Sequence, residues 1–218
     1  MADWVTISSL ATAGGTLVLA VATFGSVRSA NRAARVAELS LLAGLRPLLV
    51  TSHEDDVAQR IGFGDQVVLT VPGHGGAIEV RNGNIYMAIA LRNGGQGLAV
   101  LHGWRVWAQP MRSDRPNPPS VQEMPPLEDF RRQLRDLYIP AGDVGFWQGA
   151  IRDQEDSDYR SVCDAVEAGD RVVVDLMYGD HEGGQRTIAR FGISPWPDIE
   201  GDRAELVRYF NIDRADPR

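Results

Sequence analysis

The sequence predicts a mainly β protein: an antiparallel, immunoglobulin-like β-sandwich with short helical insertions, preceded by an N-terminal transmembrane helix and a helical stalk. Residues 4–27 contain no charged side chain, and an arginine-rich stretch without proline follows them as far as Pro47. Beyond Pro47, about seven short runs of alternating apolar and polar residues are separated by turns rich in glycine and proline. Such spacing is typical of half-buried antiparallel strands.

Residues 1–27 are expected to form a retained membrane anchor. A helix of 24 residues is about 36 Å long, and the hydrocarbon core of a bilayer measures about 30 Å. The alternatives are a cleaved signal peptide, which normally starts with basic residues absent from Met1–Asp3, and a buried helix of a soluble protein. Small residues four apart, Ala11 with Gly15 and Ala22 with Ser26, would allow self-association through the anchor or simply fill it.

Residues 28–46 are expected to form a helical juxtamembrane stalk. Arg28, Arg32 and Arg35 fall on one face of this helix, where they can contact anionic lipid headgroups. No lysine or arginine precedes the anchor, so the positive-inside rule predicts a cell-membrane protein with its main domain in the cytoplasm. A single cysteine, Cys163, fits a reducing compartment.

Residues 47–195 are expected to form the β-sandwich domain, with a Greek-key barrel as the alternative. The Asn82-Gly83 pair predicts a hairpin turn between strands at 77–80 and 85–91. Residues 171–178 and 185–193 predict a second hairpin. Further strands are expected at 47–51, 66–71, 98–108 and 144–151.

The remaining segments are interpreted as helices and loops. Six prolines within 109–126 predict a long surface loop. Apolar residues at helical spacing predict short amphipathic helices over 127–137 and 159–166. Residues 196–218 are expected to form a C-terminal tail with a short helix.

Composition excludes several classes of function. The net charge of −7 and pI near 5.1 argue against nucleic-acid binding. The chain has no lysine, so a phosphate-binding GxxxxGK[ST] loop is excluded, and one cysteine excludes an internal disulfide. GxSxG and HExxH motifs are also absent, so we expect no enzymatic activity and no cofactor.

Two candidate sites stand out within the β-rich region. Asp180, His181 and Glu182 gather in the glycine-rich loop 179–184 and are weak candidates for metal ligands, although polar residues are normal in such turns. Phe146 and Trp147 must point to opposite faces of a strand, so one ring faces outward; Trp147 is the candidate for contact with a protein partner.

Several segments together resemble a family of uncharacterised actinobacterial single-pass membrane proteins with a C-terminal β-rich domain. They are residues 16–24, 29–38, 41–47, 137–143, 145–152 and 178–187. The resemblance implies a single membrane span and brings no functional residues with it. Residues 91–99 are also similar to the strand–loop–strand of bacterial immunoglobulin-like modules.

The sequence therefore supports a membrane-tethered, non-enzymatic module that interacts with the lipid bilayer surface or with a protein partner of unknown identity. The first alternative is a ligand- or metal-binding sensor, or an enzyme, that uses the 179–184 loop. The second is a secreted or surface-displayed domain, which would require the opposite membrane orientation.

Overall fold

The computed structural model describes residues 3–109, 120–183, 185–195 and 201–213. It divides into two compact units, Met1–Gly44 and Leu45–Arg218. Residues 110–119 of the predicted loop at 109–126, and residues 196–200 and 214–218 of the predicted tail, lie outside the described residues.

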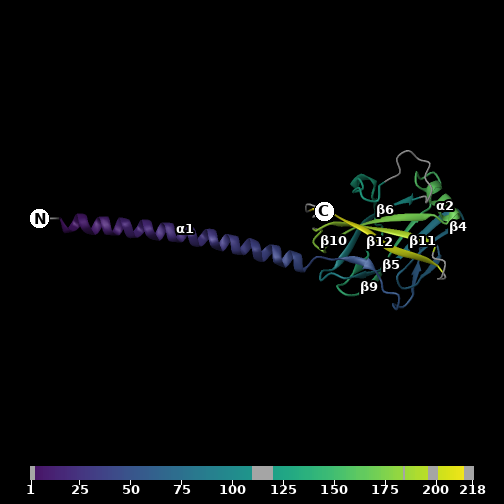
Figure 1. Ribbon diagram of the computed structural model, residues 1–218, viewed down its shortest axis with the longest axis horizontal. Coiled ribbons are helices and arrows are strands. Elements are labelled where there is room, and N and C mark those ends of the chain that lie inside the picture. Colours follow the sequence, from purple (N-terminus) through teal and green to yellow (C-terminus); the bar gives the residue numbers. More distant parts are fainter. Residues whose placement is uncertain (1–2, 110–119, 184, 196–200, 214–218) are drawn as a thin grey trace. The chain divides into compact units, whose positions relative to one another are not determined.

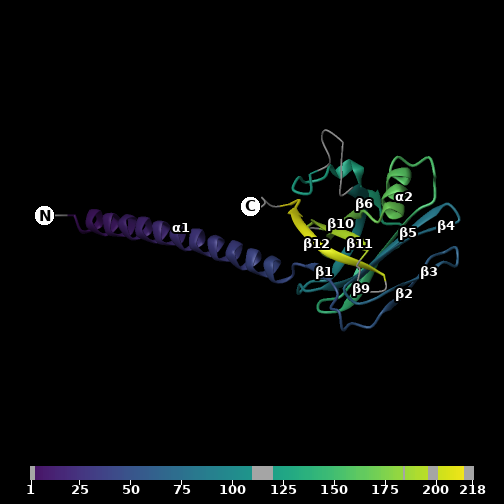
Figure 2. The ribbon, with the colours of Figure 1, turned by 45° about the vertical axis from the view of Figure 1, so that its right-hand side comes forward.

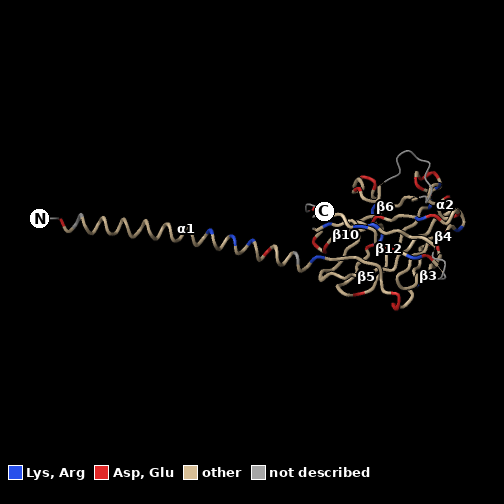
Figure 3. Tube along the Cα trace, viewed as in Figure 1, with Lys and Arg blue, Asp and Glu red and all other residues tan. Residues whose placement is uncertain are grey.

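The first unit is one continuous helix, α1 (Trp4–Gly44), which runs from the expected anchor into the expected stalk. Its apolar side chains stay exposed; those of Leu17, Val18 and Val21 are 66–68% accessible. The helix is long and apolar enough to cross a membrane, and its charged positions follow the uncharged part (Figure 3).

Three threonine hydroxyls in the uncharged part of α1 are satisfied within the helix. The hydroxyls of Thr12, Thr16 and Thr23 donate to the backbone carbonyl four residues earlier, at 2.9, 2.8 and 2.7 Å. Unsatisfied polar groups are costly in hydrocarbon, so these bonds make the segment compatible with lipid.

The second unit is built mainly from one large antiparallel sheet (Figure 1). Its strands are β1 (Leu49–Thr51), β4 (Gly75–Arg81), β5 (Asn84–Asn93), β6 (Ala99–Gln109), β7 (Arg131–Arg132), β8 (Tyr138–Ile139), β9 (Val144–Ile151), β10 (Arg171–Gly179), β11 (Thr187–Pro195) and β12 (Asp202–Asn211). The order is β1-β5-β4-β12-β11-β10-β6-β7, with β8 beside β6 and β9 beside β5. The short pairing of β4 with β12 joins the two halves of the sheet.

Strand β5 is buried on both faces because it separates two apolar clusters. Ile85, Met87, Ile89 and Leu91 contribute to the main core, together with residues of β6, β9, β10 and β11. The opposite face carries Tyr86, Ala88 and Ala90, which are covered by the hairpin of β2 (Gln59–Gly62) and β3 (Val68–Val71). Figure 2 shows this hairpin as a further layer beside β5.

The main core also contains Trp147, whose side chain is fully buried. Its ring meets that of Trp104 edge-on, with centroids 5.5 Å apart and an interplanar angle of 65°. The prediction that Trp147 contacts a partner at the surface is therefore wrong. The strand alternates as expected, but Trp147 takes the core face, and Phe146 lies half-buried on the other.

Most strand predictions are confirmed. Asn82 and Gly83 have φ values of 53° and 74°, and they form the turn between β4 and β5. The hairpin of β10 and β11 forms as predicted. The second predicted helix is α2 (Tyr159–Ala168), which ends at Gly169 with φ 69°.

The amphipathic helix predicted over 127–137 is wrong. A single 3₁₀ turn, η1 (Leu127–Asp129), is followed by the short strands β7 and β8, and Leu134 is 97% exposed. An isolated helix of 11 residues is only marginally stable in water, and the free edge of β6 offers backbone hydrogen bonds, so pairing with the sheet prevails over local periodicity.

The C-terminal tail with a short helix is also wrong where the structure describes it. Residues 202–211 form β12, which pairs with β11 along its whole length. The segment therefore belongs to the β-rich unit. Ala204 and Leu206 pack against the main core. A bulge between Arg190 and Phe191 then places Tyr209 on the same face, and Phe210 lies beside Arg190 on the opposite face.

Candidate functional site

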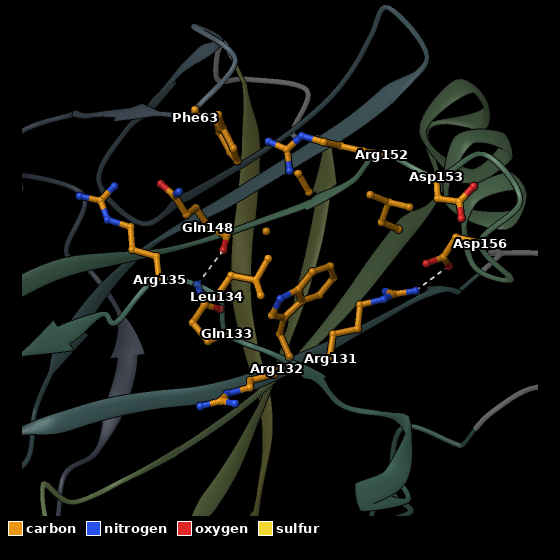
Figure 4. A pocket seen from close by; sticks show the side chains of 15 residues that line it. Phe63, Arg131, Arg132, Gln133, Leu134, Arg135, Gln148, Arg152, Asp153 and Asp156 are labelled. Carbon is orange, nitrogen blue, oxygen red and sulfur yellow. Dashed lines mark hydrogen bonds and ion pairs between the residues drawn. The ribbon is translucent and has the colours of Figure 1, made fainter.

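The large sheet has two free edges that approach each other. Among the described residues β9 pairs only with β5, and β7 and β8 pair only with β6. Between the edge of β9 and residues 131–135 lies a pocket of about 400 Å³ (Figure 4). We call it the seam pocket: one wall is residues 131–135, the other is residues 148–152, and Phe63, Gly64, Trp104, Asp153 and Asp156 complete it.

Trp104 and Arg131 form a fixed pair in this pocket. The Arg131 guanidinium lies over the Trp104 ring, 5.0 Å from its centroid. Its Nη2 donates to Asp156 Oδ1 at 2.6 Å and to Asp158 Oδ2 at 2.8 Å. These charge-assisted bonds anchor the Arg131–Arg135 wall to the loop that precedes α2.

Gly149 allows the pocket wall to pass close to the indoles. A Cβ at this position would lie 2.6 Å from Cζ2 of Trp147 and 3.2 Å from Cε2 of Trp104. Any other residue here would force the rings or the strand to move.

A second polar group borders the pocket beside β5. Tyr86 donates its hydroxyl to Asp65 Oδ2 at 2.5 Å, and Arg152 Nε contacts the same oxygen at 3.2 Å. The Tyr86 hydrogen bond and the nearby Arg152 hold the pKa of Asp65 below its usual value. The same hydrogen bond raises the pKa of Tyr86, so the tyrosine stays neutral and the carboxylate charged.

The two walls are joined by a weak contact that leaves polar atoms without partners. Gln133 Nε2 donates across the gap to the backbone oxygen of Gln148 at 3.4 Å. The amide oxygens of Gln133 and Gln148 and the Nη1 of Arg131 are buried without a hydrogen-bond partner. An unsatisfied buried polar group costs about 1–3 kcal/mol, so these three atoms favour a hydrogen-bonding partner in the pocket.

The rim of the pocket carries uncompensated positive charge. The side chains of Arg132 and Arg135 are exposed, form no hydrogen bond or ion pair with any described residue, and extend away from the pocket centre in Figure 4. The described lining residues include no histidine, cysteine, serine or threonine. Arginine, glutamine and aromatic side chains of this kind bind through charge, hydrogen bonds and contact area.

The site residues predicted from the sequence lie elsewhere. Asp180 is nearly buried and organises its own turn, because its carboxylate accepts from the Glu182 backbone N–H at 3.1 Å and from Gln185 Nε2 at 3.3 Å. His181 and Glu182 are exposed, and the described residues contain no group of three histidine, cysteine or acidic side chains suited to a metal. Arg28, Arg32 and Arg35 are exposed on α1.

No protein-family model, curated protein or solved structure matches this chain. The seam pocket was missed in the sequence because its walls come from segments that only the sheet brings together. Its one local signal is the run 131–135, which has three arginines around an exposed leucine.

Proposed function

We propose that this protein is a single-pass, membrane-tethered and non-enzymatic interaction module. The uncharged part of α1 would hold it in the bilayer, and the β-rich unit would bind a protein partner. The observation that carries the proposal is a 24-residue uncharged helical segment with exposed apolar side chains. Such a surface is stable in lipid and costly in water.

Charge supports a cytoplasmic β-rich unit. Arg28, Arg32 and Arg35 follow the uncharged segment within eight residues, and the positive-inside rule keeps such a cluster on the cytoplasmic side. The same arginines would contact anionic headgroups, each contributing about 1 kcal/mol near the surface.

Charge also favours a protein partner over the membrane surface as the target of the β-rich unit. Residues 1–44 hold three arginines and two acidic residues, so residues 45–218 hold 19 of the 22 arginines and 27 of the 29 acidic residues, a net charge of −8. An anionic leaflet would repel a unit of that charge. A partner segment that reaches only the seam pocket would meet its arginines instead.

Within this proposal the β-rich unit is an immunoglobulin-like sandwich, and the protein is a member of the actinobacterial membrane family that its sequence resembles. The two halves of the sheet enclose one core and are connected through two residue pairs between β4 and β12, as in a sandwich whose layers touch at one corner. Self-association would use the small residues Ala11 and Gly15, or Ala22 and Ser26, on α1.

Membrane retention tests the tether. Val18→Asp with Val21→Asp places two charges in the uncharged segment, where each costs about 2.5–3.5 kcal/mol in lipid. Val36→Asp with Leu39→Asp is the matched control, with the same spacing and similar exposure on the same helix but beyond the arginines.

Membranes are washed with alkaline carbonate, and the protein in pellet and supernatant is measured. Wild type and the Val36/Leu39 control should stay in the pellet, and the Val18/Val21 variant should move to the supernatant. Release of the wild type, or equal retention of both variants, would contradict the anchor.

A further inference from the structure

The seam pocket has the shape of a slot between two extended backbone segments. Its walls are two runs of five consecutive residues, 131–135 and 148–152, and the second run is the free edge of β9 and its continuation. The Gln148 carbonyl receives the Gln133 side chain, so it points into the slot. In an antiparallel pair alternate residues point their N–H and C=O the same way, so Ala150 also directs its backbone groups to the slot.

Gln133 occupies the place that a neighbouring strand would take. Its bond to Gln148 is long, at 3.4 Å, and both amide oxygens remain buried without partners. A backbone that supplied N–H and C=O groups along β9 would replace this one weak bond with a ladder of shorter ones.

We propose that the seam pocket binds an extended, acidic peptide segment of a partner protein, which adds to the edge of β9 as a further strand. This inference rests on the proposed role as an interaction module and names its binding site and the chemistry of its partner. The segment displaces the Gln133 side chain and pairs with Gln148 and Ala150. Its carboxylates face Arg132 and Arg135 at the rim.

Side chains around the slot favour a segment with alternating apolar and acidic residues. An added strand directs successive side chains to opposite faces of the sheet, so its specificity depends on the protein side chains that border the slot on each face. Trp104, Phe63 and the exposed Leu134 supply apolar contact area. Arg132 and Arg135 supply guanidinium groups that form no ion pair with any described residue and can bind carboxylates.

The net charge of the residues that line the slot favours a peptide segment of negative charge. The slot carries Arg131, Arg132, Arg135 and Arg152 against Asp153 and Asp156. Arg131 and Arg152 are already paired with Asp156 and Asp65, which leaves Arg132 and Arg135 against the single carboxylate of Asp153, an excess of one positive charge. A basic segment would meet this excess with like charge, which an acidic one avoids.

The test uses the full-length protein in nanodiscs of phosphatidylcholine, a lipid without net charge. The probe is a fluorescein-labelled pentapeptide amide of sequence Glu-Val-Glu-Val-Glu, and binding is followed by fluorescence anisotropy. One analogue replaces each glutamate with lysine. A second carries N-methyl groups on both valines, which removes backbone donors and keeps the charge.

We expect the acidic probe to bind and both analogues to bind at least about tenfold more weakly, the equivalent of about 1.4 kcal/mol. Arg132→Gln with Arg135→Gln should weaken the acidic probe by about tenfold. The matched control, Arg60→Gln with Arg160→Gln, removes two exposed arginines that do not line the slot and should leave affinity unchanged.

Absent binding of the acidic probe, equal binding of either analogue, or equal loss in both double variants would overturn the inference. The tether is judged separately by carbonate extraction. If the protein stays in the membrane pellet but does not bind the probe, only the proposed peptide site is contradicted. If it is released from the membrane but binds the probe, only the proposed anchor is contradicted.

Discussion

Arg190 and Asp175 form a two-pronged ion pair that is buried on the face of β10 and β11 opposite the main core. Nε to Oδ1 is 2.6 Å and Nη2 to Oδ2 is 3.0 Å, and the side chains are 2% and 0% exposed. The remaining nitrogen, Nη1, donates to three backbone carbonyls, those of Ser120, Val121 and Glu123. One arginine thus holds residues 120–123 of the proline-rich stretch against the sheet.

Removing one partner of this pair should be strongly destabilising. Arg190→Met leaves the Asp175 carboxylate buried without its cation and should lower the free energy of unfolding by about 3–5 kcal/mol. Arg171→Met is the control, because the Arg171–Glu205 pair on the same sheet is 33% and 40% exposed and should contribute less than about 1 kcal/mol. Guanidinium unfolding of the full-length protein in detergent, followed by tryptophan fluorescence, measures both. Equal losses would show that burial of the Arg190 pair is irrelevant.

Gly149 should tolerate no side chain because it faces two indoles. Gly149→Ala places a methyl group 2.6 Å from Trp147, and relief of this overlap should cost about 1–3 kcal/mol of unfolding free energy. Gly62→Ala in β2 is the matched control, since nothing lies within 4 Å of its added Cβ. Denaturant midpoints compare the two variants. A Gly149→Ala protein as stable as the control would refute the close packing at this wall of the seam pocket.

Tyr178 should make the fold sensitive to high pH. Its buried hydroxyl accepts the Leu49 N–H at 3.3 Å, and burial raises its pKa to about 12. An unfolded tyrosine has a pKa of about 10, so the unfolded chain loses this proton before the folded chain does. The contribution to stability is therefore complete below about pH 10 and is lost as the pH rises through about 12.

Denaturant midpoints at about pH 8 and about pH 11 measure this effect. Wild type should lose stability between them, and Tyr178→Phe should lose less because the titrating hydroxyl is gone. Tyr138→Phe is the control, since it removes a tyrosine hydroxyl from a side chain that is 54% exposed. If Tyr178→Phe lost as much stability as wild type over this pH range, Tyr178 would not be the source of the sensitivity to high pH.

Local chemistry explains which strands the sequence could predict. The turn at Asn82-Gly83 needs positive φ, and both hairpins alternate with period two, so local residues already specify them. The helical spacing over 159–166 likewise agrees with its packing in the fold. These elements are read correctly because local and tertiary preferences coincide.

The wrong predictions concern residues whose conformation or burial depends on contacts with distant parts of the chain. Apolar residues within 127–137 have helical spacing, yet the segment forms the short strands β7 and β8, which pair with β6. Leu134 is left exposed. Trp147 was expected at the surface because alternation fixes opposite faces but not which face is the core. The seam pocket combines residues 131–135 with 148–152 and Phe63, a juxtaposition that no local pattern encodes.

The arginines after the anchor should set the orientation of the protein. Wild type fused at its C-terminus to alkaline phosphatase should be inactive, and a fusion to green fluorescent protein should fluoresce, because the positive cluster stays in the cytoplasm. Changing Arg28, Arg32 and Arg35 to Gln together with Asp3→Arg moves the positive charge to the other flank and should raise phosphatase activity. Arg60→Gln with Arg160→Gln removes charge far from the anchor in sequence and should change neither reporter. Phosphatase activity in the wild-type fusion would place the β-rich unit outside the cell, where a cytoplasmic partner could not reach the seam pocket.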